Sequence, residues 1–184
     1  LNLKNNTKVY YKQNSENSTF VLYYKINIGD DNDKRLGLAS DYFTYLGSSK
    51  YSPEKLKQEF YKLACDFSMS ASNDEVTFSL SGLSDNFDKA LVLFEDYLND
   101  IKPNTEVLGN LVNDILKVRT DDKVDKNKIL WEGLSNFAKY GPKSSYTNIL
   151  SEAELKKVTP EELVKLIKTF LNYEHEIIFY GPQS

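Results

Sequence analysis

The chain has 184 residues, of which 40% are hydrophobic and 27% are charged. This length and apolar content fit one compact domain or two small ones, and they exclude a disordered tail. The net charge is −4, and the 23 Lys and Arg residues are scattered among 27 Asp and Glu residues, so nucleic acid is not an expected partner. No apolar run approaches the roughly 18 to 20 residues that span a bilayer. No signal peptide is recognisable either.

Cys65 is the only cysteine and His175 is the only histidine. One cysteine permits neither an internal disulfide nor a thiolate metal cluster, and it leaves the cellular compartment undetermined. General bases and transition-metal sites use histidine first, so a single histidine restricts catalysis strongly. The chain also lacks the glycine motifs of nucleotide-binding loops and of serine hydrolases. The residues therefore offer no self-contained active site.

The N-terminal third predicts two strands followed by two helices. The strands cover residues 7–13 and 20–29, and the polar turn between them predicts a hairpin. Apolar residues then recur at helical spacing from Leu36 until Gly47 ends the first helix. The second helix begins with Ser52 as its N-cap and with proline at its first position.

The middle of the chain predicts a second hairpin and two consecutive helices. Alternating residues mark strands over 66–72 and 75–83, with a turn between them. One helix opens at Ser84 and ends before Pro103, and the next covers residues 105–119. The charged stretch that follows, DDKVDKNK, is expected to break the helical pattern.

The C-terminal third predicts three helices and a closing strand. The helices cover residues 129–138, 151–158 and 159–170, and the last begins with a Thr-Pro-Glu-Glu cap. The strand covers residues 175–181, and we interpret His175 as an ordinary strand-edge residue because its neighbours point to the opposite face. Hairpins separated by helices predict an α+β fold, with a mainly antiparallel sheet and helices packed on one side. No linker divides the chain, so residues 1–184 are predicted to form one domain.

Several segments in this order resemble the M16 zinc metallopeptidases, the group that includes pitrilysin, insulin-degrading enzyme and mitochondrial processing peptidase. The resemblance covers nearly the whole chain. Its most specific part is the pairing of the helix GLASDYFTYLG with the later YGP and LKKVTPEEL segments. The resemblance implies that the chain is one domain of a longer multi-domain protein, a reading that also suits a chain beginning at Leu1.

Active domains of this family carry the zinc motif H-x-x-E-H on the first helix. In this chain the positions of the two histidines and the glutamate are occupied by Ser40, Thr44 and Phe43. The third ligand of the family, a glutamate, is expected around residues 117–120, and KVRT contains no carboxylate. The resemblance therefore implies a degenerate domain that has no catalytic residue, no metal and no cofactor of its own. The zinc would belong to the active half of the parent protein, a zinc metalloendopeptidase.

The resemblance implies a role in the parent protein. Two halves of such proteins close over a peptide, and the half without zinc shapes the chamber. The expected partners are the zinc-bearing half, in the same chain or in a sister subunit, and an extended peptide substrate. Tyr42, Thr44 and Arg119 are the candidates for facing the chamber. The alternative is a structural or assembly subunit without a peptidase role. A third possibility is an independent metalloenzyme with an unfamiliar site, which stoichiometric zinc in the purified chain would reveal. A periplasmic location is compatible with the family.

Overall fold

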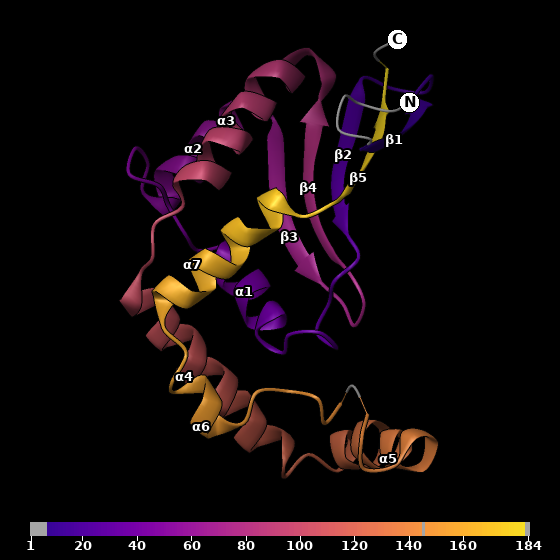
Figure 1. The fold of residues 1–184 in the computed structure, drawn as a ribbon, viewed down its shortest axis with the longest axis vertical. Coiled ribbons are helices and arrows are strands. Elements are labelled where there is room, and N and C mark those ends of the chain that lie inside the picture. The colour runs from indigo at the N-terminus through magenta and orange to yellow at the C-terminus, as the bar shows by residue number, and fades with distance from the viewer. Residues whose placement is uncertain (1–6, 145, 183–184) are drawn as a thin grey trace.

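The structure, a computed structural model, describes residues 7–144 and 146–182, so Leu1 and Ser145 lie outside the described residues. It is an α+β fold in which five strands form one sheet. The helices that pack on this sheet all lie on the same side of it (Figure 1). The predicted fold class is confirmed.

The strand order in the sheet is β1 (Lys8–Gln13), β5 (Glu176–Gly181), β2 (Thr19–Ile26), β4 (Val76–Leu83) and β3 (Cys65–Ala71). β1 and β5 run parallel, and the other three pairings are antiparallel. The predicted hairpin β3–β4 is confirmed, and Val76, Phe78 and Leu80 of β4 are buried on the helix-covered face.

The predicted hairpin between β1 and β2 is wrong, because β5 lies between these two strands. Asn14 makes the wide connection possible: its backbone N–H donates to the carbonyl of Gly181 at the end of β5 (2.8 Å), and its side chain organises the turn that leads to β2. β5 carries Ile177 and Phe179 on the core face and Ile178 on the other. A strand that is apolar on both faces is typical of a position inside a sheet.

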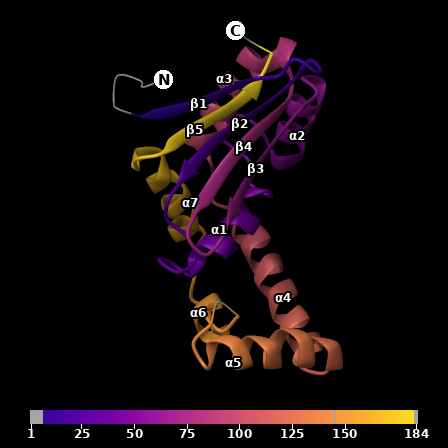
Figure 2. The same ribbon diagram turned by 90° about the vertical axis from the view of Figure 1, so that its right-hand side faces the viewer.

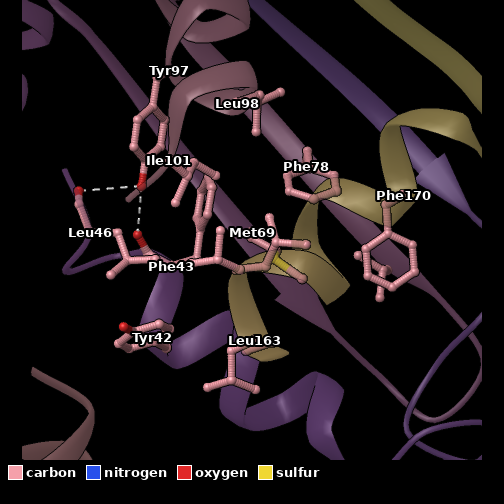
Figure 3. Packing of buried hydrophobic residues seen from close by; sticks show 14 of the residues in the cluster. Tyr42, Phe43, Leu46, Met69, Phe78, Tyr97, Leu98, Ile101, Leu163 and Phe170 are labelled. Atoms are coloured by element: carbon pink, nitrogen blue, oxygen red, sulfur yellow. Dashed lines mark hydrogen bonds between the residues drawn. The ribbon is translucent and has the colours of Figure 1, made fainter. Parts of the chain in front are cut away.

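Four helices cover the sheet: α1 (Arg35–Phe43), α2 (Pro53–Lys62), α3 (Phe87–Asp100) and α7 (Pro160–Thr169). α1 ends at Phe43, before the predicted stop at Gly47, because a turn begins at Thr44. The single-turn helix η1 (Ser84–Asn86) precedes α3, and the single-turn helix η3 (Phe170–Asn172) follows α7. Large side chains from these helices and from the sheet form the core (Figure 3).

The remaining helices extend away from the sheet (Figure 2). α4 (Thr105–Asp122) continues into the charged stretch that was expected to break it. The predicted helix over residues 129–138 is present as a π-helical segment η2 (Lys128–Leu134) followed by α5 (Ser135–Tyr140), and α6 (Glu152–Leu155) returns the chain to the sheet. We call η2 and α5 together the arm. No helix among the described residues is long and apolar enough to cross a membrane.

Candidate functional site

The three residues that the resemblance places at the H-x-x-E-H positions lie on α1 and just after it. Ser40 is half-buried, and its Oγ donates a hydrogen bond to the carbonyl of Met69 in β3 (3.1 Å). Phe43 is fully buried, with its ring against those of Phe67, Phe78 and Tyr97. Thr44 follows the end of α1 and is exposed. A hydroxyl tied to the sheet and a core phenyl ring occupy positions where zinc would need imidazole and carboxylate groups.

α4 supplies no substitute for the third ligand. Residues 117–120 contain two basic side chains, a valine and a threonine. Thr120 Oγ1 donates to the carbonyl of Leu116 within the helix (2.9 Å). Across the described ranges 7–144 and 146–182, no group of three His, Cys, Asp or Glu residues could hold a metal ion. The residues present therefore do not fit a zinc ion, which needs nitrogen, sulfur or carboxylate ligands.

Tyr42 is a core residue, and this corrects the expectation that its side chain faces a chamber. The side chain is fully buried, and its hydroxyl donates to the carbonyl of Asn104 (2.9 Å) while it accepts from the Asn104 backbone N–H (2.7 Å). Burial raises the pKa of this phenol, so it remains a neutral donor. Tyr42 fastens α1 to the start of α4 and leaves no side-chain surface for a peptide.

Arg119 lies on the part of α4 that extends away from the sheet. Its Nη1 donates to the carbonyl of Leu150 (2.6 Å), and Leu150 is a buried residue of the segment that returns from the arm. The guanidinium group therefore holds two segments together that are 31 residues apart in the chain. The structure does not bring Arg119 to Thr44 through any contact, so the three candidate residues do not form one site.

A groove runs beside β3, at the edge of the sheet. Its volume is about 600 Å³, and its walls come from the end of α1, from α2 and from β3 itself. The residues that line it are Thr44, Lys57, Phe60, Tyr61, Cys65, Asp66, Phe67 and Ser68. The pairings of the described strands give β3 a partner on one side only, which is β4. The groove thus places an edge strand next to the end of α1, where the resemblance predicts the zinc motif.

Thr44 is the only predicted candidate that lines this groove. Lys57 and Tyr61 were missed because they lie on the polar, exposed face of α2, where a sequence pattern predicts solvent contact alone. The signal was the large aromatic side chain of Tyr61 on that face, which is 84% exposed. Burial raises the pKa of the Cys65 thiol, so the lone cysteine at the groove is an unreactive one.

His175 precedes β5, which begins at Glu176, so its predicted place inside the closing strand is wrong. Its Nδ1 lies 2.9 Å from the carbonyl of Tyr173, and its ring packs edge-on against the ring of Tyr24. The single histidine is thus held in the connection between η3 and β5, away from the groove beside β3.

Comparisons with known proteins agree in fold. No protein-family model matches the sequence, and no curated protein matches it. The structure of a peptidase M16 inactive domain from Pseudomonas fluorescens aligns with 100% of this chain over 46% of its own length, with 21% sequence identity and a TM-score of 0.79. The ferredoxin protease FusC, solved as a mutant in complex with Arabidopsis ferredoxin, covers 100% with 21% of its chain, at 15% identity and a TM-score of 0.80.

The periplasmic protease PqqL from Escherichia coli covers 94% of this chain with 20% of its own, at 15% identity and a TM-score of 0.75. The chain thus spans less than half the length of each of these three solved structures. At these identities the likeness concerns the fold alone. The chain has the fold of the inactive domains of M16 peptidases.

Proposed function

We propose that this chain is a non-catalytic domain of an M16 zinc metallopeptidase, which shapes the peptide-binding chamber and packs against the zinc-bearing half. The zinc and the catalytic residues would belong to that other half. The proposal draws on the fold shared with an M16 inactive domain and on the replacement of all the zinc ligands in this chain. The parent protein would carry out proteolysis, and this chain would contribute to substrate binding but not to the chemical step.

The observation that carries the proposal is the groove beside β3. An edge strand offers unpaired backbone N–H and C=O groups, to which an extended peptide can add as a further strand. The groove supplies apolar wall from Phe60 and Phe67 and one side chain of each charge, Lys57 and Asp66. Main-chain hydrogen bonds with few specific side-chain contacts suit a chamber that accepts many unfolded peptides.

The proposed contact with another half is supported by two observations. The solved structures with this fold are longer chains of which this chain matches a part. The arm also exposes apolar side chains that no described residue covers, and exposed apolar patches mark sites of protein contact. The same arm favours the alternative, a structural or assembly subunit without a peptidase role, in which the groove beside β3 would bind no peptide.

The test measures binding of a fluorescein-labelled extended peptide without Lys or Arg by fluorescence anisotropy. We expect weak, saturable binding, because the contacts are chiefly main-chain hydrogen bonds. Tyr61→Ala should weaken it about threefold to tenfold, because an aromatic contact at a binding surface is worth on the order of 1 kcal/mol. Tyr61 is largely exposed, so this variant should keep its fold.

Tyr140→Ala is the matched control, because Tyr140 is also exposed, at 63%, but lies on α5. This variant should bind the peptide as the unchanged chain does. Absence of saturable binding, or an equal loss in both variants, would reject the peptide-binding role and leave the structural alternative.

A further inference from the structure

A second cavity lies between the sheet, the last turns of α3 and the connection that follows α7. Its volume is about 260 Å³. We call it the Tyr24 pocket, and the residues that line it are Tyr24, Ile26, Phe78, Glu95, Leu98, Asn99, Phe170 and His175. None of them lines the groove beside β3, so the two hollows are separate.

The floor of the Tyr24 pocket is apolar. It is made by Ile26, Phe78, Leu98 and Phe170, which are each at most 4% exposed. Phe78, Leu98 and Phe170 border the core from three different elements, β4, α3 and η3 (Figure 3). An aliphatic chain that enters this floor would replace water on an apolar surface, which favours binding.

The polar groups at the mouth are hydrogen-bond acceptors. The Tyr24 hydroxyl donates to Glu95 Oε1 (3.3 Å), which fixes the carboxylate and leaves Oε2 for a ligand. Asn99 Nδ2 donates to the backbone carbonyl of Glu95 (2.9 Å), so the side-chain oxygen Oδ1 is the atom of this amide that remains as an acceptor. Burial and the neighbouring Glu95 raise the pKa of Tyr24, which keeps the phenol a neutral donor to the carboxylate.

The ring of His175 also lines the Tyr24 pocket. Its Nδ1 lies 2.9 Å from the carbonyl of Tyr173, and because a carbonyl can only accept, Nδ1 carries the proton. Nε2 is the ring nitrogen that is left for a ligand. The ring is held edge-on against Tyr24, with 5.8 Å between the ring centroids. The orientation of the imidazole is thus set by contacts within the chain.

No lysine or arginine within the described residues lines the Tyr24 pocket. Lys25, which follows Tyr24 in β2, pairs with Glu75, and Lys8 of β1 pairs with Glu176 (3.8 Å). Glu95 makes no ion pair among the described residues. A ligand cation would meet a carboxylate that no lysine or arginine already neutralises.

We propose that the Tyr24 pocket binds an aliphatic cation, an alkylguanidinium or alkylammonium group, with its stem on the apolar floor and its head at Glu95, Asn99 and His175. The carboxylate of Glu95 and Asn99 Oδ1 accept hydrogen bonds, which matches a head that only donates them, and the carboxylate also complements the charge of the head. An anion would meet Glu95 and is excluded by it. One source of this cation is an arginine or lysine side chain of a bound peptide, and this source depends on the proposed function. A free cation as the ligand does not depend on it.

The probes are a labelled Gly-Gly-Arg-Gly-Gly peptide, the same peptide with citrulline, and free agmatine as an unlabelled competitor. Citrulline keeps the shape of arginine and removes its charge. We expect the arginine peptide to bind about tenfold more tightly than the citrulline peptide, because a hydrogen bond between two charged groups is stronger than one from a neutral donor to the same carboxylate. Glu95→Gln should abolish this difference while it preserves the size of the side chain.

Asp96→Asn is the matched control, because it removes the same charge from the neighbouring position of α3, which lines a different hollow. This variant should keep the preference for arginine. Displacement of the peptide by agmatine at similar concentration would identify a free cation as a sufficient ligand, and much weaker displacement would identify the peptide as the source.

Equal binding of the arginine and citrulline peptides, or an arginine preference that survives Glu95→Gln, would overturn the assignment of the Tyr24 pocket. The groove beside β3 is tested with a peptide that has no basic residue, so the two proposals can fail independently. Agmatine binding that depends on Glu95 would support the pocket even where the groove bound no peptide.

Discussion

Two tyrosine hydroxyls organise the loops around α1. Tyr42 bonds both backbone groups of Asn104, and Tyr97 of α3 lies 2.9 Å from the carbonyl of Phe43 and 3.3 Å from that of Leu46 (Figure 3). A helix ends with carbonyl groups that have no partner inside the helix, and Tyr97 satisfies such groups where α1 ends. The turn that replaces the last predicted residues of α1 is stabilised from outside its own segment.

Tyr97→Phe is therefore expected to destabilise the chain. The hydroxyl is buried, so its removal takes this donor from the carbonyl of Leu46 and leaves the Phe43 carbonyl with the Leu46 N–H alone, at a cost of about 1–3 kcal/mol. Urea unfolding followed by circular dichroism measures the change. Tyr61→Phe, which removes an exposed hydroxyl, should leave the midpoint unchanged, and equal midpoints for both variants would contradict this role of Tyr97.

Helix starts are the elements whose sequence signals act most directly. α7 begins with a capping box: Thr159 Oγ1 accepts from the Glu162 N–H (3.3 Å), and Glu162 Oε2 accepts from the Thr159 N–H (2.8 Å). α7 then buries Leu163, Val164 and Ile167 against the rest of the core. The local signal and the core contacts therefore place the helix start at the same residue.

Thr159→Ala is expected to lower the free energy of unfolding by about 1 kcal/mol, since it leaves a backbone donor of the first turn unsatisfied. Thermal and urea unfolding would both show the loss. Thr120→Ala serves as the control within a helix, because Thr120 is an exposed threonine near the end of α4 whose hydroxyl bonds back to Leu116. Alanine is the better helix former there, so any change should be neutral or stabilising, and a loss like that of Thr159→Ala would argue against the cap.

The whole molecule divides into a core that is built on the sheet and an arm that extends beyond it (Figure 2). The core contains the largest fully buried side chains, among them Tyr97 of α3 and Phe20 of β2. The arm instead exposes a set of large apolar residues at 47% or more: Ile129, Leu130, Trp131, Leu134, Phe137 and Tyr140. Such a distribution suits a protein that completes its packing through contact with another surface.

Trp131, the only tryptophan, makes the state of the arm measurable. Its side chain is 69% exposed, so we expect acrylamide to quench its fluorescence in the isolated chain nearly as well as that of N-acetyltryptophanamide. Urea unfolding should change the emission little, although circular dichroism should show a cooperative transition of the core.

Burial of the arm against the proposed zinc-bearing half, added as a separate protein, should protect Trp131 from the quencher. Strong protection in the isolated chain at low concentration would contradict the exposed arm. Protection that increases with the concentration of the chain would identify a second copy as what covers it.

Most elements were predictable, because strand alternation, helical periodicity and N-caps are local patterns. Ser52 and Thr159 begin helices in the structure as the sequence predicts. The replacement of the zinc ligands by Ser40, Phe43 and Thr44 is also a property of the sequence alone, once the resemblance aligns the first helix. The candidate site was less predictable, since of the three suggested residues only Thr44 lines the groove beside β3.

The sequence by itself determined the order of the elements and the α+β class, because each depends on neighbours within a few residues. Only the tertiary structure decided that β5 lies between β1 and β2, that Tyr42 is buried, and that Glu95 and His175 share a cavity. These features join segments far apart in the chain. A pattern of period two or 3.6 states which face of an element is apolar, and it carries no information about the distant element that covers that face.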